Sequence, residues 1–146
     1  MKVDIYSRKA VESINKEDFP KNTAVISFFD PDGTKFDCTG LTYEVFYVQI
    51  YDIDIDVLEK YGLTEETYFP EADDLAKFIY NAKNNGLDII CQCQYGQSRS
   101  TACAAAILQH FEQDGISIFA DYRYYLNQLV YHKIFDALER YKNNHS

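Results

Sequence analysis

Apolar positions along the chain predict four β-strands. In one segment every second residue is apolar, the pattern of a half-buried strand, and in another the apolar run is almost continuous, as in the buried centre of a parallel sheet. Two shorter runs rich in β-branched and aromatic residues complete the set, and one of them is closed by the turn sequence Asp30-Pro31-Asp32-Gly33. The predicted strands are Val3–Tyr6, Ala24–Phe29, Val45–Tyr51 and Leu87–Cys93.

Apolar residues at three- and four-residue spacing predict three helices between and after these strands. They cover Glu71–Asn84, Ser98–Phe111 and about Tyr124–Tyr141. Alternation of strands with helices of this length indicates βαβ units, and therefore an α/β domain with a mostly parallel sheet covered on both faces. Ligands of such sheets bind beyond the carboxyl ends of the strands, so the loops after Cys93 and Tyr51 are the expected site.

Composition narrows the class of protein. The 146 residues fit one domain, 1–146, and 47 % apolar with 25 % charged residues is ordinary globular usage. A formal net charge of −9 argues against a broad contact with nucleic acid or an anionic membrane, although one local anion pocket remains compatible with it. We expect a cytoplasmic protein with four reduced cysteines, because neither a signal peptide nor an apolar membrane span is evident.

The segment from Cys93 to Ser100 carries the candidate chemistry. A buried strand delivers Cys93 to a short loop, and the loop leads directly into a helix. Gly96 allows a positive φ and a close approach of the backbone to a ligand, while the helix N-terminus offers unpaired N–H groups. Arg99, one turn into the helix, can give a two-pronged hydrogen bond to a tetrahedral oxyanion. These parts predict a phosphate cradle with a thiol at its base.

The same surroundings activate the thiol. Helix N-termini and neighbouring arginines lower a thiol pKa, which favours a Cys93 thiolate, the nucleophilic form. Ser100 can donate a hydrogen bond to the sulfur and help it leave in a second step. The alternative is a glycine turn between strand and helix followed by a surface arginine; against it, cysteine, glycine, arginine and serine at these spacings seldom occur together by chance.

Cys93-x5-Arg99-Ser100 with Gly96 resembles the phosphate-binding loop of cysteine-based protein tyrosine phosphatases, and the Ser98-Arg99-Ser100 ending resembles their dual-specificity branch. Weaker similarities to small bacterial and phage-type members lie outside the loop. They are Tyr6-Ser7-Arg8, Ala24-Val25-Ile26-Ser27, Phe69-Pro70-Glu71-Ala72, Tyr125-Leu126-Asn127 and Val130-Tyr131. The resemblance implies a central, mostly parallel sheet of four to five strands flanked by helices.

The resemblance also implies a mechanism. Cys93 would be the nucleophile and form a cysteinyl-phosphate intermediate, and the phosphoryl oxygens would be bound by the loop residues Gln94, Tyr95, Gly96, Gln97, Ser98 and Arg99. An aspartate from another loop would protonate the leaving oxygen and then activate water. Asp52 falls at that position, with Asp54 as the alternative and Asp56 also open; a solvated acidic loop is the competing interpretation. No metal or other cofactor is required.

Two residues depart from the family pattern. Gln92 stands where the family usually has a histidine, so a cationic neighbour of the thiolate is lost. Tyr95 is bulkier than the usual residue and narrows the mouth of the cradle. The roles of Asn127 and of Cys91, a small buried filler or a redox partner of Cys93, stay open.

Three functions compete. The first is hydrolysis of phosphotyrosine in a phosphorylated protein, with phosphoserine and phosphothreonine as a wider version. The second is a catalytically silent module that binds phosphate or phosphotyrosine, and the third is a phosphatase for a non-protein, small phosphoester. The loop has no lysine between Cys93 and Arg99, which argues against a phosphoinositide. The physiological substrate and the oligomeric state are left open by the sequence.

Overall fold

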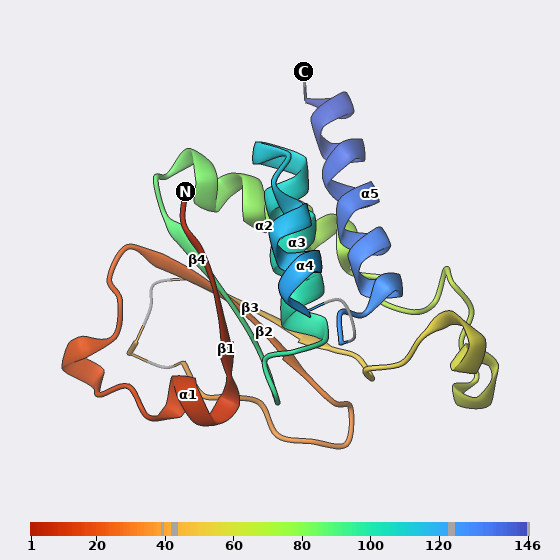
Figure 1. Ribbon diagram of the computed structural model, residues 1–146, viewed down its shortest axis with the longest axis horizontal. Helices are drawn as coiled ribbons and strands as arrows, with labels where there is room; N and C mark the ends of the chain where they lie inside the picture. Colours follow the sequence, from red (N-terminus) through yellow and green to blue (C-terminus); the bar gives the residue numbers. More distant parts are fainter. Residues whose placement is uncertain (39, 42–43, 123–124, 146) are drawn as a thin grey trace.

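In the computed structural model, which describes residues 1–38, 40–41, 44–122 (backbone only at Tyr122) and 125–145, four parallel strands form one sheet (Figure 1). Their order is β1 (Val3–Ser7), β4 (Asp88–Cys93), β2 (Thr23–Phe29) and β3 (Glu44–Gln49). Each strand lies within two residues of its predicted bounds, and every pairing is parallel. The predicted α/β class is therefore confirmed.

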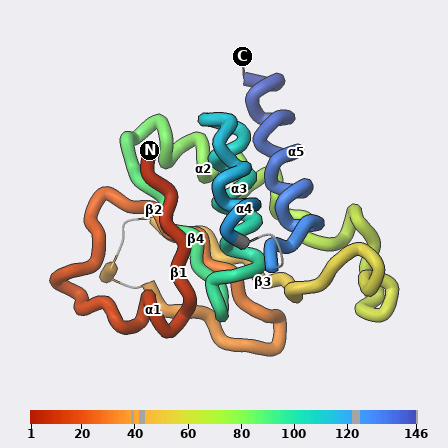
Figure 2. The backbone as a smooth tube through the Cα atoms, viewed as in Figure 1, coloured from red at the N-terminus to blue at the C-terminus, as the bar shows by residue number. Residues whose placement is uncertain are grey.

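The main hydrophobic core lies between one face of the sheet and the long helices α2 (Ala72–Asn84), α3 (Arg99–Glu112) and α5 (Gln128–Asn144). Residues at every second position of β2 and β4 point into it, as the period of two in a strand requires. Helices α3 and α5 run side by side (Figure 2), and the strand residues in this core are Ala24, Ile26, Phe28, Val48, Ile89, Cys91 and Cys93. Central strands buried in this way account for the nearly continuous apolar pattern of β4.

The opposite face of the sheet is also covered, as predicted, but by less regular structure. It carries the short helix α1 (Arg8–Glu12), which was not predicted, and irregular segments around the 3-10 turn η1 (Lys16–Asp18). Its smaller core contains Val11, Phe19, Val25, Phe36, Cys38 and Ile90. A short helix with one buried residue leaves too weak a period to be recognised in the sequence.

The C-terminal helices also differ from the prediction. The last helix, predicted from about Tyr124, is α5 (Gln128–Asn144), and α4 (Gly115–Tyr122) before it was not predicted; Tyr124 itself lies outside the described residues. Asn127 caps α5, because its side-chain oxygen accepts a hydrogen bond from the Val130 N–H at 2.9 Å. The 3-10 helix η2 (Ile55–Tyr61) was likewise not predicted. Apolar periodicity does not detect an N-cap, so the predicted helix began several residues before the observed one.

The cysteines form no disulfide bond: all four are free and buried. His110 is held between the Tyr80 hydroxyl at 2.5 Å and a Glu139 carboxylate oxygen at 2.9 Å. Among the residues described, no helix is both long and apolar enough to cross a bilayer.

The carboxyl ends of all four strands lie at one edge of the sheet, because the strands are parallel. Four segments start there: α1 after β1, the turn at Asp30 after β2, the loop around Asp52 after β3, and the loop 94–98 after β4. They are far apart in sequence and adjacent in space. This edge holds the candidate site.

Candidate active site

The loop between β4 and α3 is a tight turn packed against the end of β1. Its Gly96 has a φ of 70°. A Cβ at this position would lie 2.8 Å from the backbone nitrogen of Ser7 and 3.1 Å from the carbonyl carbon of Tyr6. The Arg8 N–H also donates to the Gln94 carbonyl at 3.2 Å. Both conformation and space therefore require glycine, and the loop keeps its shape through its neighbour as well as its own sequence.

The thiol of Cys93 lies at the base of this loop and is 2 % exposed. Its sulfur is 3.0 Å from the Ser100 hydroxyl, and it accepts a hydrogen bond from the Gly96 N–H at 3.3 Å. Burial taken alone would raise the pKa of Cys93. The Ser100 hydroxyl and the backbone N–H groups of the loop and of the start of α3 outweigh burial, so the pKa is lowered. The site therefore favours a thiolate.

Arg99 begins α3 and is 3 % exposed. Its Nη1 donates to the Asp30 carboxylate at 2.8 Å and to the Ile50 carbonyl at 2.6 Å. Its Nε is buried and makes no hydrogen bond to any described residue. Buried donors are nearly always paired, so a buried nitrogen of a cation that has no acceptor among the described residues is a place where an anionic ligand would complete the site.

Asp52 lies against the loop, although it belongs to the segment that follows β3. One of its oxygens, Oδ1, accepts hydrogen bonds from the Ser98 hydroxyl at 2.6 Å and from the Asn127 amide at 2.8 Å. The Asn127 backbone N–H in turn donates to the Ser98 carbonyl at 3.2 Å. A carboxyl group is therefore held beside the thiol-bearing loop by two neutral donors, with its other oxygen outside these contacts.

Further contacts fix the backbone on both sides of Asp52. The Tyr68 hydroxyl donates to the Tyr51 carbonyl at 2.6 Å, and the Asn127 amide donates to the Ile53 carbonyl at 3.0 Å. Burial, together with the nearby Asp52 carboxylate, raises the pKa of Tyr68, so this phenol stays a donor. The carboxyl position is set by residues from outside its own loop.

The other two aspartates of this segment lie elsewhere. Asp54 accepts a hydrogen bond from the Ile55 N–H at 2.7 Å and caps η2. Asp56 is exposed in the first turn of η2. Of the three carboxylates considered from the sequence, Asp52 alone contacts the Cys93 loop among the described residues.

Gln92 has a definite structural role. Its amide nitrogen donates to the Cys93 carbonyl at 3.0 Å, and its amide oxygen accepts a hydrogen bond from the Ser27 hydroxyl. Gln92 thus ties the base of the loop to β2 without adding a charge. Tyr95 is 78 % exposed and stands at the mouth of the site.

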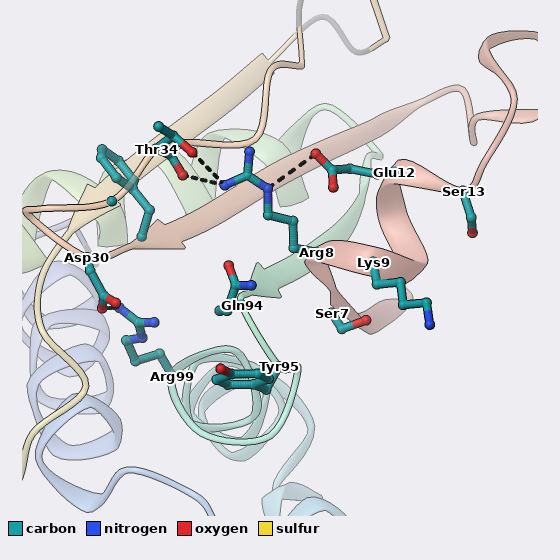
Figure 3. A pocket seen from close by; sticks show the side chains of 12 residues that line it. Ser7, Arg8, Lys9, Glu12, Ser13, Asp30, Thr34, Gln94, Tyr95 and Arg99 are labelled. Atoms are coloured by element: carbon teal, nitrogen blue, oxygen red, sulfur yellow. Dashed lines mark hydrogen bonds and ion pairs between the residues drawn. The ribbon is translucent and has the colours of Figure 1, made fainter.

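An open cleft of about 1020 Å³ lies beside the loop (Figure 3). Gln94, Tyr95 and Arg99 line one side of it. The other walls come from α1 and from the turn after β2, and include Arg8 and Asp30. This is room for a substrate much larger than inorganic phosphate.

Sequence reasoning missed two residues and left one undecided. Asp30 was read only as part of a turn, and Arg8 only as part of a weak family similarity. For Asn127 the sequence left two roles open, a helix cap or a hydrogen bond to the Cys93 loop. It has both, because it caps α5 and its backbone N–H donates to the Ser98 carbonyl. Asp30 carried one usable signal, because it directly follows a strand of the predicted parallel sheet.

Comparisons with known proteins identify the fold. No protein-family model and no curated protein matches the sequence. Among solved structures, human DUSP28 aligns with a TM-score of 0.61 and 13 % identity over 96 % of this chain and 90 % of that chain. Tk-PTP in its active form gives 0.56 and 13 % identity over 96 % and 93 %. PTPMT1 in complex with PI(5)P gives 0.53 and 11 % identity over 99 % and 95 %.

These structures confirm the fold inferred from the sequence. The chain has the α/β fold of the cysteine-based tyrosine and dual-specificity phosphatases, with a parallel sheet flanked by helices. At identities this low the likeness concerns the fold, so the chemistry has to be argued from the residues of this site.

Proposed function

We propose that this protein is a cysteine-dependent phosphatase that hydrolyses phosphotyrosine in proteins, and phosphoserine or phosphothreonine if the cleft admits them. The observation that carries the proposal is the Nε of Arg99, which is buried and makes no hydrogen bond to any described residue, at the start of the helix that follows a loop holding a thiol of lowered pKa. A phosphoryl group in the cradle gives that nitrogen an acceptor and presents its phosphorus to the sulfur.

In the first step the Cys93 sulfur attacks phosphorus, and the bond from phosphorus to the leaving oxygen breaks. Arg99 and the backbone N–H groups of residues 94–99 neutralise the charge on the phosphoryl oxygens. Asp52 gives its proton to the leaving oxygen, which departs as an alcohol or phenol. The two donors at Oδ1 of Asp52 leave Oδ2 to carry that proton.

In the second step water attacks the cysteinyl phosphate. Asp52, now a carboxylate, takes a proton from the water, and the bond between sulfur and phosphorus breaks. The Ser100 hydroxyl, 3.0 Å from the sulfur, stabilises the departing thiolate with a hydrogen bond. Inorganic phosphate leaves, and the enzyme returns to its starting state.

A protein substrate fits the charge of the site better than a phosphoinositide does. Residues 94–98 carry no lysine or arginine, and the chain has a formal net charge of −9. Such a surface repels an anionic membrane. PTPMT1, which shares the fold, is bound to PI(5)P in its structure, so a non-protein phosphoester is the second candidate.

The test is hydrolysis of an aryl phosphate between pH 5 and 8 in the presence of a metal chelator. We expect turnover by the wild type and a loss of about 10³-fold or more in Cys93→Ser, because serine is a far poorer nucleophile at these pH values. Cys38→Ser is the matched control, since Cys38 is buried on the other face of the sheet. A phosphotyrosine peptide and a phosphoinositide are then compared by kcat/KM.

Two outcomes would overturn the proposal. A wild type that binds tungstate through Arg99 but hydrolyses no ester would be a silent binding module. A phosphoinositide hydrolysed with a higher kcat/KM than the peptide would move the substrate to the non-protein class.

A further inference from the structure

We propose that Arg8 is a positioning residue that ties the three walls of the cleft together and fits the site to a phosphorylated polypeptide rather than to a small phosphoester; this inference rests on the phosphatase activity proposed above. Arg8 follows β1, begins α1 and lines the cleft (Figure 3). It acts through the position of the cleft walls, while Cys93, Arg99 and Asp52 keep the chemical roles already given.

The cleft is formed by three segments that are far apart in the sequence. One wall is α1 with the residue before it, the second is the turn after β2, and the third is the loop that follows β4. At about 1020 Å³ the cleft is as large as the cavities that hold drug-sized ligands, roughly 300–1,000 Å³. It therefore has room for a phosphorylated side chain together with neighbouring residues of a polypeptide.

Arg8 contacts both of the other walls. Its backbone N–H donates to the Gln94 carbonyl in the Cys93 loop at 3.2 Å. Its Nη1 donates to the carbonyl and the hydroxyl oxygen of Thr34, the latter at 3.1 Å, and its Nη2 donates to the Lys35 carbonyl at 3.4 Å. Its Nε contacts Glu12, one turn along α1, at 3.2 Å. One residue therefore joins α1, the segment after β2 and the phosphate-binding loop.

The shape of the guanidinium group suits this role. Its five N–H donors lie in one rigid plane and reach oxygens of two consecutive residues at once, whereas a lysine ammonium group is a single compact charge. The acceptors at Thr34 and Lys35 are neutral oxygens, so this contact depends on hydrogen-bond geometry rather than on charge alone. The pair with Glu12, whose side chain is 47 % exposed, lies within α1 and contributes little by itself.

The segment after β2 is attached to the sheet by other residues. The Gln49 amide donates to the Pro31 carbonyl at 3.1 Å, and the Tyr47 hydroxyl donates to the Phe36 carbonyl at 2.8 Å. Both donors belong to β3, whereas Arg8 reaches the segment from the opposite edge of the sheet, where β1 lies. Loss of the Arg8 side chain therefore leaves the segment folded on β3 but releases it from the cleft side.

Substitution of Arg8 leaves the phosphate-binding loop as an internal reference. The N–H that donates to Gln94 belongs to the backbone, so this hydrogen bond persists when the side chain is changed. Binding of a bare oxyanion in the loop should therefore be independent of the Arg8 side chain, while the fit of a polypeptide should depend on it.

Two rival roles have to be separated from this one. A residue that only stabilises the fold would lower the melting temperature and affect every substrate alike. A residue that binds an anionic group of the substrate would be replaced by lysine without loss. A positioning residue weakens the binding of a large substrate and spares a small one, because only the large one contacts all the walls.

The experiment uses the full chain with Arg8→Ala and Arg8→Lys, and Arg140→Ala as the matched control, because Arg140 pairs with Asp73 on an exposed surface. The values of kcat and KM are measured for para-nitrophenyl phosphate and for a phosphotyrosine decapeptide with blocked ends whose other side chains are uncharged. Tungstate affinity is measured by calorimetry in a Cys93→Ser background, and thermal unfolding checks that each variant folds.

We expect Arg8→Ala to raise KM for the peptide by about 10-fold while kcat stays within twofold of wild type, as is usual when uniform binding is lost. KM for para-nitrophenyl phosphate and the tungstate affinity should both stay within twofold. Arg8→Lys should raise the peptide KM nearly as much, because the charge is kept and the paired hydrogen bonds are lost. Arg140→Ala should match the wild type. If the alanine variant does not fold, Arg8→Lys carries the same comparison.

A peptide KM within twofold of wild type in both Arg8 variants would overturn the inference. So would a KM that rises equally for the peptide and the small ester, a loss of tungstate affinity, or full activity toward the peptide in Arg8→Lys. If the wild type hydrolyses no ester, the peptide and tungstate affinities of the Cys93→Ser protein decide. A loss of peptide affinity alone in Arg8→Ala would then keep the role of Arg8, while the proposed enzymatic function fails.

Discussion

The two loops that form the site are held in different ways. The Cys93 sulfur is held by local contacts, with Gly96 three residues on and Ser100 seven residues on, although the loop itself also packs against β1. The Asp52 loop depends on distant partners, since Ser98 lies 46 residues away and Asn127 lies 75 residues away. The surroundings of the candidate nucleophile are thus encoded in one short segment, while the position of the candidate acid depends on the whole fold.

This difference predicts how each loop responds to mutation. Changes in the Cys93 loop remove donors that act directly on the phosphoryl group, so their effects should be large. Changes around Asp52 should be graded, because several independent contacts share the positioning of that loop. The predictions below are ordered by the size of the expected effect.

Arg99→Lys, a change at the end of the Cys93 loop, should cause the largest loss of activity. Lysine keeps the positive charge but cannot supply the fork or hold Asp30 and Ile50 together, so kcat/KM for an aryl phosphate should fall by about 10³-fold. The measurement is steady-state kinetics at the pH optimum. Arg140→Lys is the control, because Arg140 pairs with Asp73 on an exposed surface. A loss below 10-fold would contradict the cradle.

Asp52→Asn tests the Asp52 loop, which is held by distant partners. Asparagine preserves the acceptor at Ser98 and Asn127 but has no proton to give, so kcat should fall by about 10²-fold and the alkaline limb of the pH–rate profile should disappear. Asp54→Asn is the matched variant and should leave the profile unchanged, since Asp54 caps η2. A larger effect in Asp54→Asn would reverse the assignment.

A smaller effect on activity is expected from changing Asn127, which positions the Asp52 loop. The two variants are Asn127→Ser and Asn127→Asp. Serine and aspartate both cap helices well, so α5 should keep its start while the amide donor to Asp52 is lost. For Asn127→Ser we expect a loss of about 10-fold in kcat with little change in thermal stability. For Asn127→Asp the new carboxylate disfavours ionisation of Asp52, so the alkaline limb should move to higher pH. If the pH–rate profiles of both variants matched that of the wild type, Asn127 would act only as a helix cap.

The smallest expected effect is on the pH dependence of folding stability, through the ionisation of Cys93. The folded state lowers the pKa of Cys93, so the unfolded chain binds the proton more tightly and stability from this group rises with pH. This contribution is complete above the pKa of the unfolded thiol and is lost as pH falls through the folded pKa. The melting temperature of wild type minus that of Cys93→Ser should therefore increase from pH 6 to pH 9. A flat or falling difference would mean that the loop does not stabilise the thiolate.

Much of the fold could be predicted because its signals are local. The four strands and α2 follow from apolar periodicity, and β4 was recognisable as central because both of its faces are buried. The elements that were not predicted are α1, η1, η2, α4 and the start of α5 at Gln128. They are short, or begin at a cap such as Asn127, and a few residues do not establish a period.

The sequence by itself indicated Cys93, Arg99 and Gly96 as the candidate nucleophile, phosphate-binding arginine and loop glycine, because they lie within a single strand–loop–helix segment whose spacing follows from backbone geometry. It also narrowed the candidate acid to three neighbouring aspartates. Only the tertiary structure showed that, among the described residues, Asp52 is the one that contacts the Cys93 loop, gave Asn127 two contacts and brought Asp30 to Arg99. The physical reason is that hydrogen bonds between distant side chains depend on how the strands are ordered in the sheet, and the order β1-β4-β2-β3 cannot be read from any one segment.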